Sequence, residues 1–318
     1  MTRRSRHAAL LFLIAAAALA WAPMARAQQM AAPKAPHPVI ERQVAPDLYF
    51  VFDYDSSNAG FLVTDEGVLV IDTRQHPRDG QDLIDRIRKI TDKPIKWVVN
   101  THFHGDHHFG DPPFKALGAT IVAHKDTAAL MQKTFAKEIG RRGRFFKSRG
   151  YDPAEVKLIV PDVTFDHDMT IRLGGKEIKL IYLGPGQNPG DTFVLIPHDR
   201  TIYTPGAFAR RSWANTAFTP SVESWIKLLN EVARMDVDRV LPAHGDVATR
   251  ADVGDMAKFL ADEYAGVKDA VAKGMSVEDA VKTLTFPQYK DYRNYRVREH
   301  DIRSLYNLIK TGKSSYFD

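Results

Sequence analysis

The stretch Asn100-Thr101-His102-Phe103-His104-Gly105-Asp106-His107 places four potential metal ligands, at positions 102, 104, 106 and 107, within six residues. The apolar run of residues 95–100 leads into them and has the composition of a buried strand. The ligands therefore fall on the loop that follows this strand. Neighbouring histidines would repel one another if protonated, so neutral imidazoles bound to a metal explain the cluster better than a chance solvated group. Nitrogen and oxygen donors of this kind suit zinc.

The first 27 residues have the pattern of a secretory signal peptide. Three arginines precede an apolar segment at residues 8–20, and Ala25-Arg26-Ala27 forms a cleavage site. The apolar segment is short for a membrane span, although an uncleaved anchor is the alternative. The sequence therefore predicts a periplasmic or secreted protein without stable membrane insertion.

The charge of the chain does not favour a nucleic-acid partner. Four of the 44 basic residues lie in the first 27 residues and none of the 39 acidic ones do, so 40 and 39 remain after cleavage. Such a balance lacks the concentrated basic charge that nucleic-acid binding needs. The chain has no cysteine, so neither disulfides nor thiolate zinc ligands are available.

Hydrophobic periodicity predicts a flexible leader at 28–42, a main domain at 43–272 and a helical extension at 273–318 packed on that domain. Residues 79–91 and about 126–139 have helical patterns, as has the segment after Ser221, and the chain is helical from Asp252 onward. Strands are predicted at 48–52, 60–64, 68–72, 95–100, 156–160, 169–173, 177–183, 192–196, 201–204 and 240–241. This order suggests two sheets packed face to face with helices outside.

Four segments of the chain together resemble the metallo-β-lactamase fold superfamily. They are the hairpin residues 57–63 with 70–73, the histidine-rich stretch 100–107, the segment Leu183-Gly184-Pro185-Gly186-Gln187-Asn188-Pro189-Gly190-Asp191-Thr192, and Leu241-Pro242-Ala243-His244-Gly245. The resemblance implies an α+β fold, the αββα four-layer sandwich, with the site at one edge between the two sheets.

The resemblance also implies two metal sites. One would use His102, His104 and the residue at position 187; the other would use Asp106, His107 and His244. The chain departs from the family pattern twice, because Gln187 stands where a histidine is usual and Ala207 aligns with a bridging aspartate. We therefore expect one tightly bound zinc ion at Asp106, His107 and His244, and a second ion that is weakly bound or absent.

The function that the resemblance implies is a zinc-dependent hydrolase. Hydroxide generated by the zinc would attack a small ester, lactone, lactam or thioester, with Asp106, His102 and His104 as the catalytic residues. Asp72 would steady the metal-binding loop from outside the ligand set, or would only cap backbone amides. A metal-binding pseudoenzyme or accessory binding module and a true metallo-β-lactamase are the alternatives.

Substrate contacts are predicted in the basic stretch 137–149 and after the altered position 207. Phe145 and Phe146 would line a pocket, and Arg144, with Arg141 or Arg142, would hold an anionic group. Arg210 is a second candidate for an anion. The alternative is a solvated helix end whose phenylalanines belong to the core. The sequence indicates a small-molecule substrate and leaves the oligomeric state open.

Overall fold

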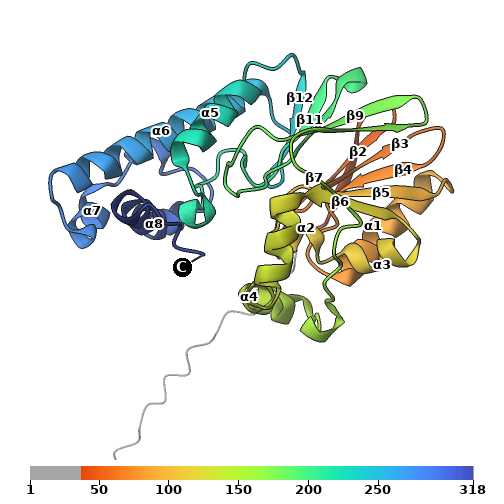
Figure 1. Ribbon diagram of the computed structural model, residues 1–318, viewed down its shortest axis with the longest axis horizontal. Coiled ribbons are helices and arrows are strands. Elements are labelled where there is room, and N and C mark those ends of the chain that lie inside the picture. Colours follow the sequence, from red (N-terminus) through yellow and green to blue (C-terminus); the bar gives the residue numbers. More distant parts are fainter. Residues whose placement is uncertain (1–36, 318) are drawn as a thin grey trace, which may run out of the picture. The chain divides into compact units, whose positions relative to one another are not determined.

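The computed structural model describes residues 37–317, which form two β-sheets and the helices that cover them (Figure 1). The first sheet has seven strands in sequence order: β1 (Ile40–Ala45), β2 (Leu48–Phe52), β3 (Ala59–Val63), β4 (Val68–Ile71), β5 (Ile95–Asn100), β6 (Thr120–His124) and β7 (Val163–Phe165). The second has the order β12 (Arg239–Leu241), β11 (Thr201–Tyr203), β10 (Phe193–Ile196), β9 (Lys176–Ile181) and β8 (Met169–Leu173).

Strand direction changes within each sheet. Strands β1 to β4 are antiparallel neighbours, whereas β4 to β7 are parallel. The second sheet is antiparallel except for the parallel pair β11 and β12. Because β4 and β5 run in parallel, the loops that follow them emerge at the same edge of the sheet. The metal-binding loop follows β5 at this edge.

The helices lie in two outer layers. The chain forms α1 (Pro77–Ile90), α2 (Gly105–His108), α3 (Asp111–Ala116), α4 (Lys125–Arg149), α5 (Val222–Val232), α6 (Arg250–Ala272), α7 (Val277–Thr283) and α8 (Arg298–Thr311). Helices α1 and α3 cover the first sheet, and α5 and α6 cover the second (Figure 1). Short 3-10 turns lie at Pro153–Glu155, Pro197–Asp199, Thr216–Phe218, Pro287–Tyr289 and Tyr295–Val297.

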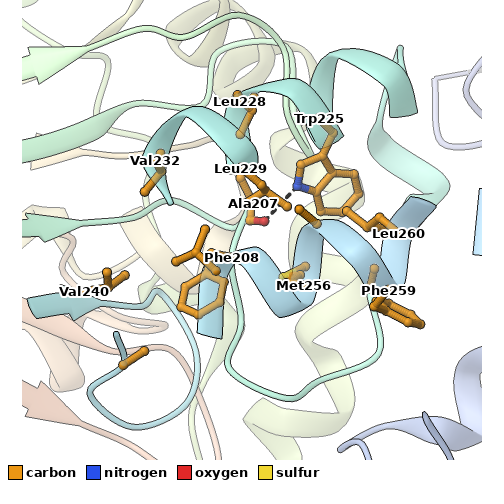
Figure 2. Close-up of a cluster of buried hydrophobic side chains, with 14 of the residues drawn as sticks. Ala207, Phe208, Trp225, Leu228, Leu229, Val232, Val240, Met256, Phe259 and Leu260 are labelled. Carbon is orange, nitrogen blue, oxygen red and sulfur yellow. Dashed lines mark hydrogen bonds between the residues drawn. The ribbon is translucent and has the colours of Figure 1, made fainter. Parts of the chain in front are cut away.

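The period-two alternation of strand side chains builds these layers. In β4, Val68 and Val70 face helix α1, whereas Leu69 and Ile71 face the second sheet. On the far side of the second sheet, Phe193 packs with side chains from α5 and α6. Figure 2 shows part of this cluster, with Trp225 on α5 and Met256 on α6. The αββα four-layer sandwich is therefore confirmed.

Several element boundaries differ from those predicted. Helix α4 continues to Arg149, where Gly150 ends it with a φ of 65°, so the basic stretch after residue 139 is helical. Residues 156–160 form no strand; β7 begins only at Val163, after Pro161, which lacks the N–H that strand pairing needs. Residues 40–42, assigned to the leader, belong to β1 and pair with β2.

The C-terminal helices pack on the main domain. Ile302 and Leu305 of α8 and Val281 of α7 form a cluster with Val267 and Ala270 of α6. The predicted signal peptide and residues 28–36 lie outside the described part of the chain. Within residues 37–317, the structure contains no helix with the length and apolar character that a membrane crossing requires.

Candidate metal centre

The metal-binding loop is fully enclosed at the edge between the sheets. His102, His107 and His108 are buried, and His104 and Asp106 are exposed by only 6% and 3%. The loop leaves β5 after Asn100 and enters the short helix α2 at Gly105. A buried cluster of this chemistry needs internal partners, because desolvated polar groups without partners are costly.

Asp72, the residue after β4, holds this loop. Its Oδ1 accepts from the backbone N–H of Thr101 at 2.8 Å, and its Oδ2 accepts from the Thr101 hydroxyl at 2.9 Å. The same Oδ2 lies 2.8 Å from Nδ1 of His107. Both halves of the carboxylate are thus engaged with the loop, and the Nε2 atom of His107 is directed away from it.

Three donor atoms, Nε2 of His107, Nε2 of His244 and Oδ2 of Asp106, lie close together. His107 Nε2 lies 3.3 Å from His244 Nε2, and Oδ2 of Asp106 lies 3.7 Å and 3.4 Å from these two atoms. The Nδ1 atom of His244 faces the carbonyl of Ser56 at 3.2 Å. The Nε2 atoms of His102 and His104 are buried without a hydrogen-bond partner.

These donors fit a metal ion. The donor atoms of Asp106, His107 and His244 all lie within 4.8 Å of one another, and the unpartnered Nε2 atoms of His102 and His104 provide further donors. Asp72, His102 and His107 also form a group within that distance, but the Asp72 carboxylate is already occupied by Thr101 and His107. The set of imidazoles with one carboxylate is typical of zinc.

The protonation states of three histidines and of Asp106 favour metal binding. At His107, burial lowers the pKa, but the carboxylates of Asp106 and Asp72 outweigh it and raise the pKa above its usual value. Burial lowers the pKa values of His102 and His104 well below the usual range and that of His244 to about 4. Burial alone would raise the pKa of Asp106, but the Arg142 guanidinium and the neighbouring histidines hold it well below its usual value. Neutral imidazoles and an ionised carboxylate are the forms that coordinate metals.

Gln187 reaches the same space as His102. A Cβ atom built on Gly206 would lie 2.4 Å from Oε1 of Gln187 and 2.9 Å from Nε2 of His102. Gly206 therefore faces the site, and a side chain at this position would collide with these two groups.

Ala207, which aligns with the bridging position of the family, lies in an apolar environment. It is fully buried among apolar side chains, and its carbonyl accepts a 2.8 Å hydrogen bond from Nε1 of Trp225 (Figure 2). It packs on α5. The neighbouring Gly206, and not Ala207, is the residue whose Cβ direction points at His102 and Gln187.

Helix α4 supplies a second set of charges to the loop. Arg142 forms an ion pair with Oδ1 of Asp106, the oxygen that does not face the histidines. Oε2 of Glu138 accepts from the N–H of Gly105 at 3.1 Å, and its Oε1 accepts from the Tyr316 hydroxyl at 2.6 Å. Burial opposes ionisation of Glu138, but His104, Arg141 and Arg142 lower its pKa to about 2.

The sequence interpretation missed Glu138 and Tyr316. The acid at 138 followed by arginines at 141 and 142 has the i, i+3 and i+4 spacing of helical ion pairs, which is a signal that could have pointed to Glu138. Tyr316 gives no such signal, because its contact with Glu138 joins residues 178 positions apart.

Two connected cavities lie over the site. One of about 240 Å³ is lined by His104, Asp106, Gln187 and Gly206, and one of about 900 Å³ is lined by Arg144 and Phe145. Both share the residues Asp106, Arg141, Arg142, His244, Arg293 and Asn294. The metal-binding residues thus open onto a space that can hold a small molecule.

Two predicted candidates lie elsewhere. Phe146 is fully buried against Phe109 and belongs to the core, as the alternative interpretation expected. Arg210 pairs with Asp252 at 3.1 Å and lines a separate pocket. His108, which directly follows the histidine-rich stretch, has its Nε2 atom 3.1 Å from the carbonyl of Phe103.

Comparison with known proteins identifies the class to which this fold and site belong. The profile of the metallo-beta-lactamase superfamily matches residues 53–244. The match covers more than half of the chain and includes Asp72, the histidine-rich loop and His244. The chain therefore belongs to the metallo-beta-lactamase superfamily.

Individual relatives are distant. The linear primary-alkylsulfatase of Pseudomonas sp. (strain ATCC 19151) is 23% identical over 283 residues, covering 76% of this chain and 53% of that enzyme. The metallo-beta-lactamase type 2 of Elizabethkingia meningoseptica is 27% identical over 147 residues, covering 46% of this chain and 50% of that one. The chain thus spans about half the length of these curated relatives.

Solved structures show the same fold. The stereoselective inverting sec-alkylsulfatase Pisa1 of Pseudomonas sp. superimposes with a TM-score of 0.70 at 17% identity, over 85% of this chain and 50% of that one. At this identity the similarity concerns the fold alone.

Proposed function

We propose that this protein is an exported, zinc-dependent hydrolase of small substrates. One zinc ion would be held by Asp106, His107 and His244. The observation that carries the proposal is the convergence of buried imidazole and carboxylate donors beside a cavity that is open to small molecules. Export rests on the signal-like first 27 residues and would make the protein periplasmic or secreted.

The residues at the site would have different roles. His102, His104 and Gln187 would orient the substrate and the attacking water, or hold a second ion weakly, since an amide oxygen is a poorer ligand than an imidazole. When bound, the zinc would supply a water molecule of lowered pKa. One carboxylate oxygen of Asp106 would bind the zinc, and the other pairs with Arg142. The ion pair with Arg142 would fix the orientation of the Asp106 side chain.

The reaction would add one water molecule across the bond that is broken. An ester would yield an acid and an alcohol, and a lactone, lactam or thioester would open or split in the same way. A sulfate ester joins these candidates, because one relative is a linear primary-alkylsulfatase. The arginines of the larger cavity favour a substrate with negative charge.

Metal analysis tests this proposal. The mature protein, purified without added metal, should contain about one zinc per chain, and Asp106→Ala should lose it. The exposed carboxylate of Asp65 provides the control, because Asp65→Ala leaves the site untouched. Two ions per chain would show that Gln187 is a competent ligand, and no ion after zinc is supplied would overturn the hydrolase proposal.

A metal-binding pseudoenzyme is the second candidate. Two observations favour it: Gln187 and Ala207 stand where the family's usual ligands are expected, and Arg142 already pairs with Asp106. Zinc binding without turnover of any ester, lactam or sulfate ester would support this function. Turnover confined to β-lactams would instead indicate a true metallo-β-lactamase.

A further inference from the structure

The C-terminal extension contributes directly to the cavity over the metal centre. Arg293, in the segment between α7 and α8, lines both the smaller and the larger cavity. Its backbone is fixed, because its carbonyl accepts from Trp213 N–H at 2.7 Å and its N–H donates to the Arg211 carbonyl at 2.9 Å. These two main-chain hydrogen bonds therefore hold the backbone of Arg293 in place independently of its side chain.

The guanidinium of Arg293 is anchored but not neutralised. It lies 4.8 Å from the centre of the Tyr54 ring, and Nη2 donates to the Tyr54 carbonyl at 3.2 Å. Within residues 37–317 it forms no ion pair with an acidic side chain. An arginine carries five N–H donors, so several remain for a ligand.

The other charges of the larger cavity are mostly compensated. Arg141 pairs with Glu138, and Arg142 pairs with Asp106. The remaining carboxylate of the lining, Asp55, faces His37 and Arg149. Arg293 and the exposed Arg144 are thus the lining cations that have no acidic partner in the described part of the chain.

We propose that Arg293 determines specificity by binding a negatively charged group, a carboxylate or sulfate, on the substrate. The inference rests on the proposed hydrolase function and names its substrate class. Arg293 lines both cavities together with Asp106 and His244, so a small molecule bound there contacts the metal centre and the free guanidinium at once. A planar guanidinium favours the paired oxygens of such a group.

The test compares two esters with the same leaving group, 4-nitrophenyl hemisuccinate, which is anionic, and 4-nitrophenyl valerate, which is neutral. Arg293→Gln should lower kcat/KM for the anionic ester roughly tenfold or more, since a charge-assisted hydrogen bond is lost. The neutral ester should change by less than about twofold. Arg293→Lys should restore part of the preference, and Arg296→Gln, at an exposed neighbouring position, is the matched control.

Binding of inorganic sulfate, measured by calorimetry, separates this inference from the hydrolase proposal. If Arg293→Gln loses sulfate binding, the role of Arg293 in anion binding is supported, whether or not the esters are hydrolysed. If neither ester is hydrolysed by the wild-type protein, only the proposed ester hydrolysis is contradicted. Equal loss on both esters, or sulfate binding unchanged in the variant, would overturn the role of Arg293. A site specific for carboxylates would bind succinate and not sulfate. Calorimetry with both anions therefore shows which of the two groups Arg293 binds.

Discussion

Oδ2 of Asp72 lies 2.8 Å from Nδ1 of His107, and both side chains are completely buried. The contact directs the Nε2 atom of His107 toward His244 and Asp106. Because Asp72 follows β4 and His107 belongs to the loop after β5, the parallel pairing of these strands is what brings the two residues together. The tautomer and orientation of a metal-binding histidine are often set by such a carboxylate.

Replacing Asp72 by asparagine should therefore weaken zinc binding roughly 10- to 100-fold, the usual effect of losing an outer-sphere partner. Zinc affinity measured by chelator competition checks this expectation. Asp65→Asn, at an exposed turn position, is the control. An Asp72→Asn protein with unchanged affinity would show that the carboxylate only caps the backbone of Thr101.

The approach of Gln187 to His102 predicts how a second metal site can be strengthened. Gln187→His should raise the zinc content toward two per chain, because an imidazole replaces a weaker amide ligand at this point. Ala207→Asp should instead destabilise the protein by about 3 kcal/mol or more, since it buries a carboxylate in an apolar cluster. Elemental analysis and thermal unfolding of both variants distinguish the two positions. A Gln187→His protein with no more zinc than the wild type would contradict the first expectation.

The contrast between positions 206 and 207 shows how far the sequence could predict the site. Ligands in one contiguous stretch, such as His102 and His107, were recognisable because their spacing is itself the signal. Most strands were predictable from their β-branched and aromatic content, although β6 was missed. A one-residue choice between Gly206 and Ala207 depends on backbone direction, which no residue type there encodes.

Contacts between distant segments were beyond prediction for another reason. The approach of Arg293 to Tyr54 joins residues 239 positions apart and depends on how the C-terminal extension packs. The helical character of the extension could be predicted, but its orientation on the main domain could not. Arg142 was named as an anion-binding candidate, yet only the structure pairs it with Asp106.

The C-terminal segment should also stabilise the metal-binding loop. The Tyr316 hydroxyl donates to Glu138, whose other oxygen accepts from the N–H of Gly105. Tyr316→Phe should lower the free energy of unfolding by about 1 kcal/mol, because Oε1 of Glu138 loses one hydrogen bond but keeps its contact with Arg141. Chemical denaturation measures the change, with Tyr49→Phe as a control at a half-buried tyrosine. A loss no larger than in Tyr49→Phe would show that the hydrogen bond contributes little.

A buried acidic pair away from the metal centre predicts a dependence of stability on pH. Burial raises the pKa of Asp301, on α8, to about 8, and it also raises that of Glu263, on α6, well above the usual range. Arg298 is the nearby cation, and its charge acts against this increase at Glu263. The folded protein therefore keeps a proton on Asp301 that the unfolded chain releases above about pH 4.

The stabilisation from this protonated carboxyl is complete below about pH 4 and is lost as the pH rises toward 8. The side chain introduced by Asp301→Asn cannot ionise. The melting temperature of this variant, relative to that of the wild-type protein, should therefore rise between pH 5 and pH 8. The relative gain in unfolding free energy should be roughly 1 kcal/mol per pH unit at most. Circular dichroism melts at several pH values measure it, with the exposed Asp291→Asn as control. If the difference in melting temperature between Asp301→Asn and wild type is the same at pH 5 and pH 8, Asp301 does not retain its proton in the folded state.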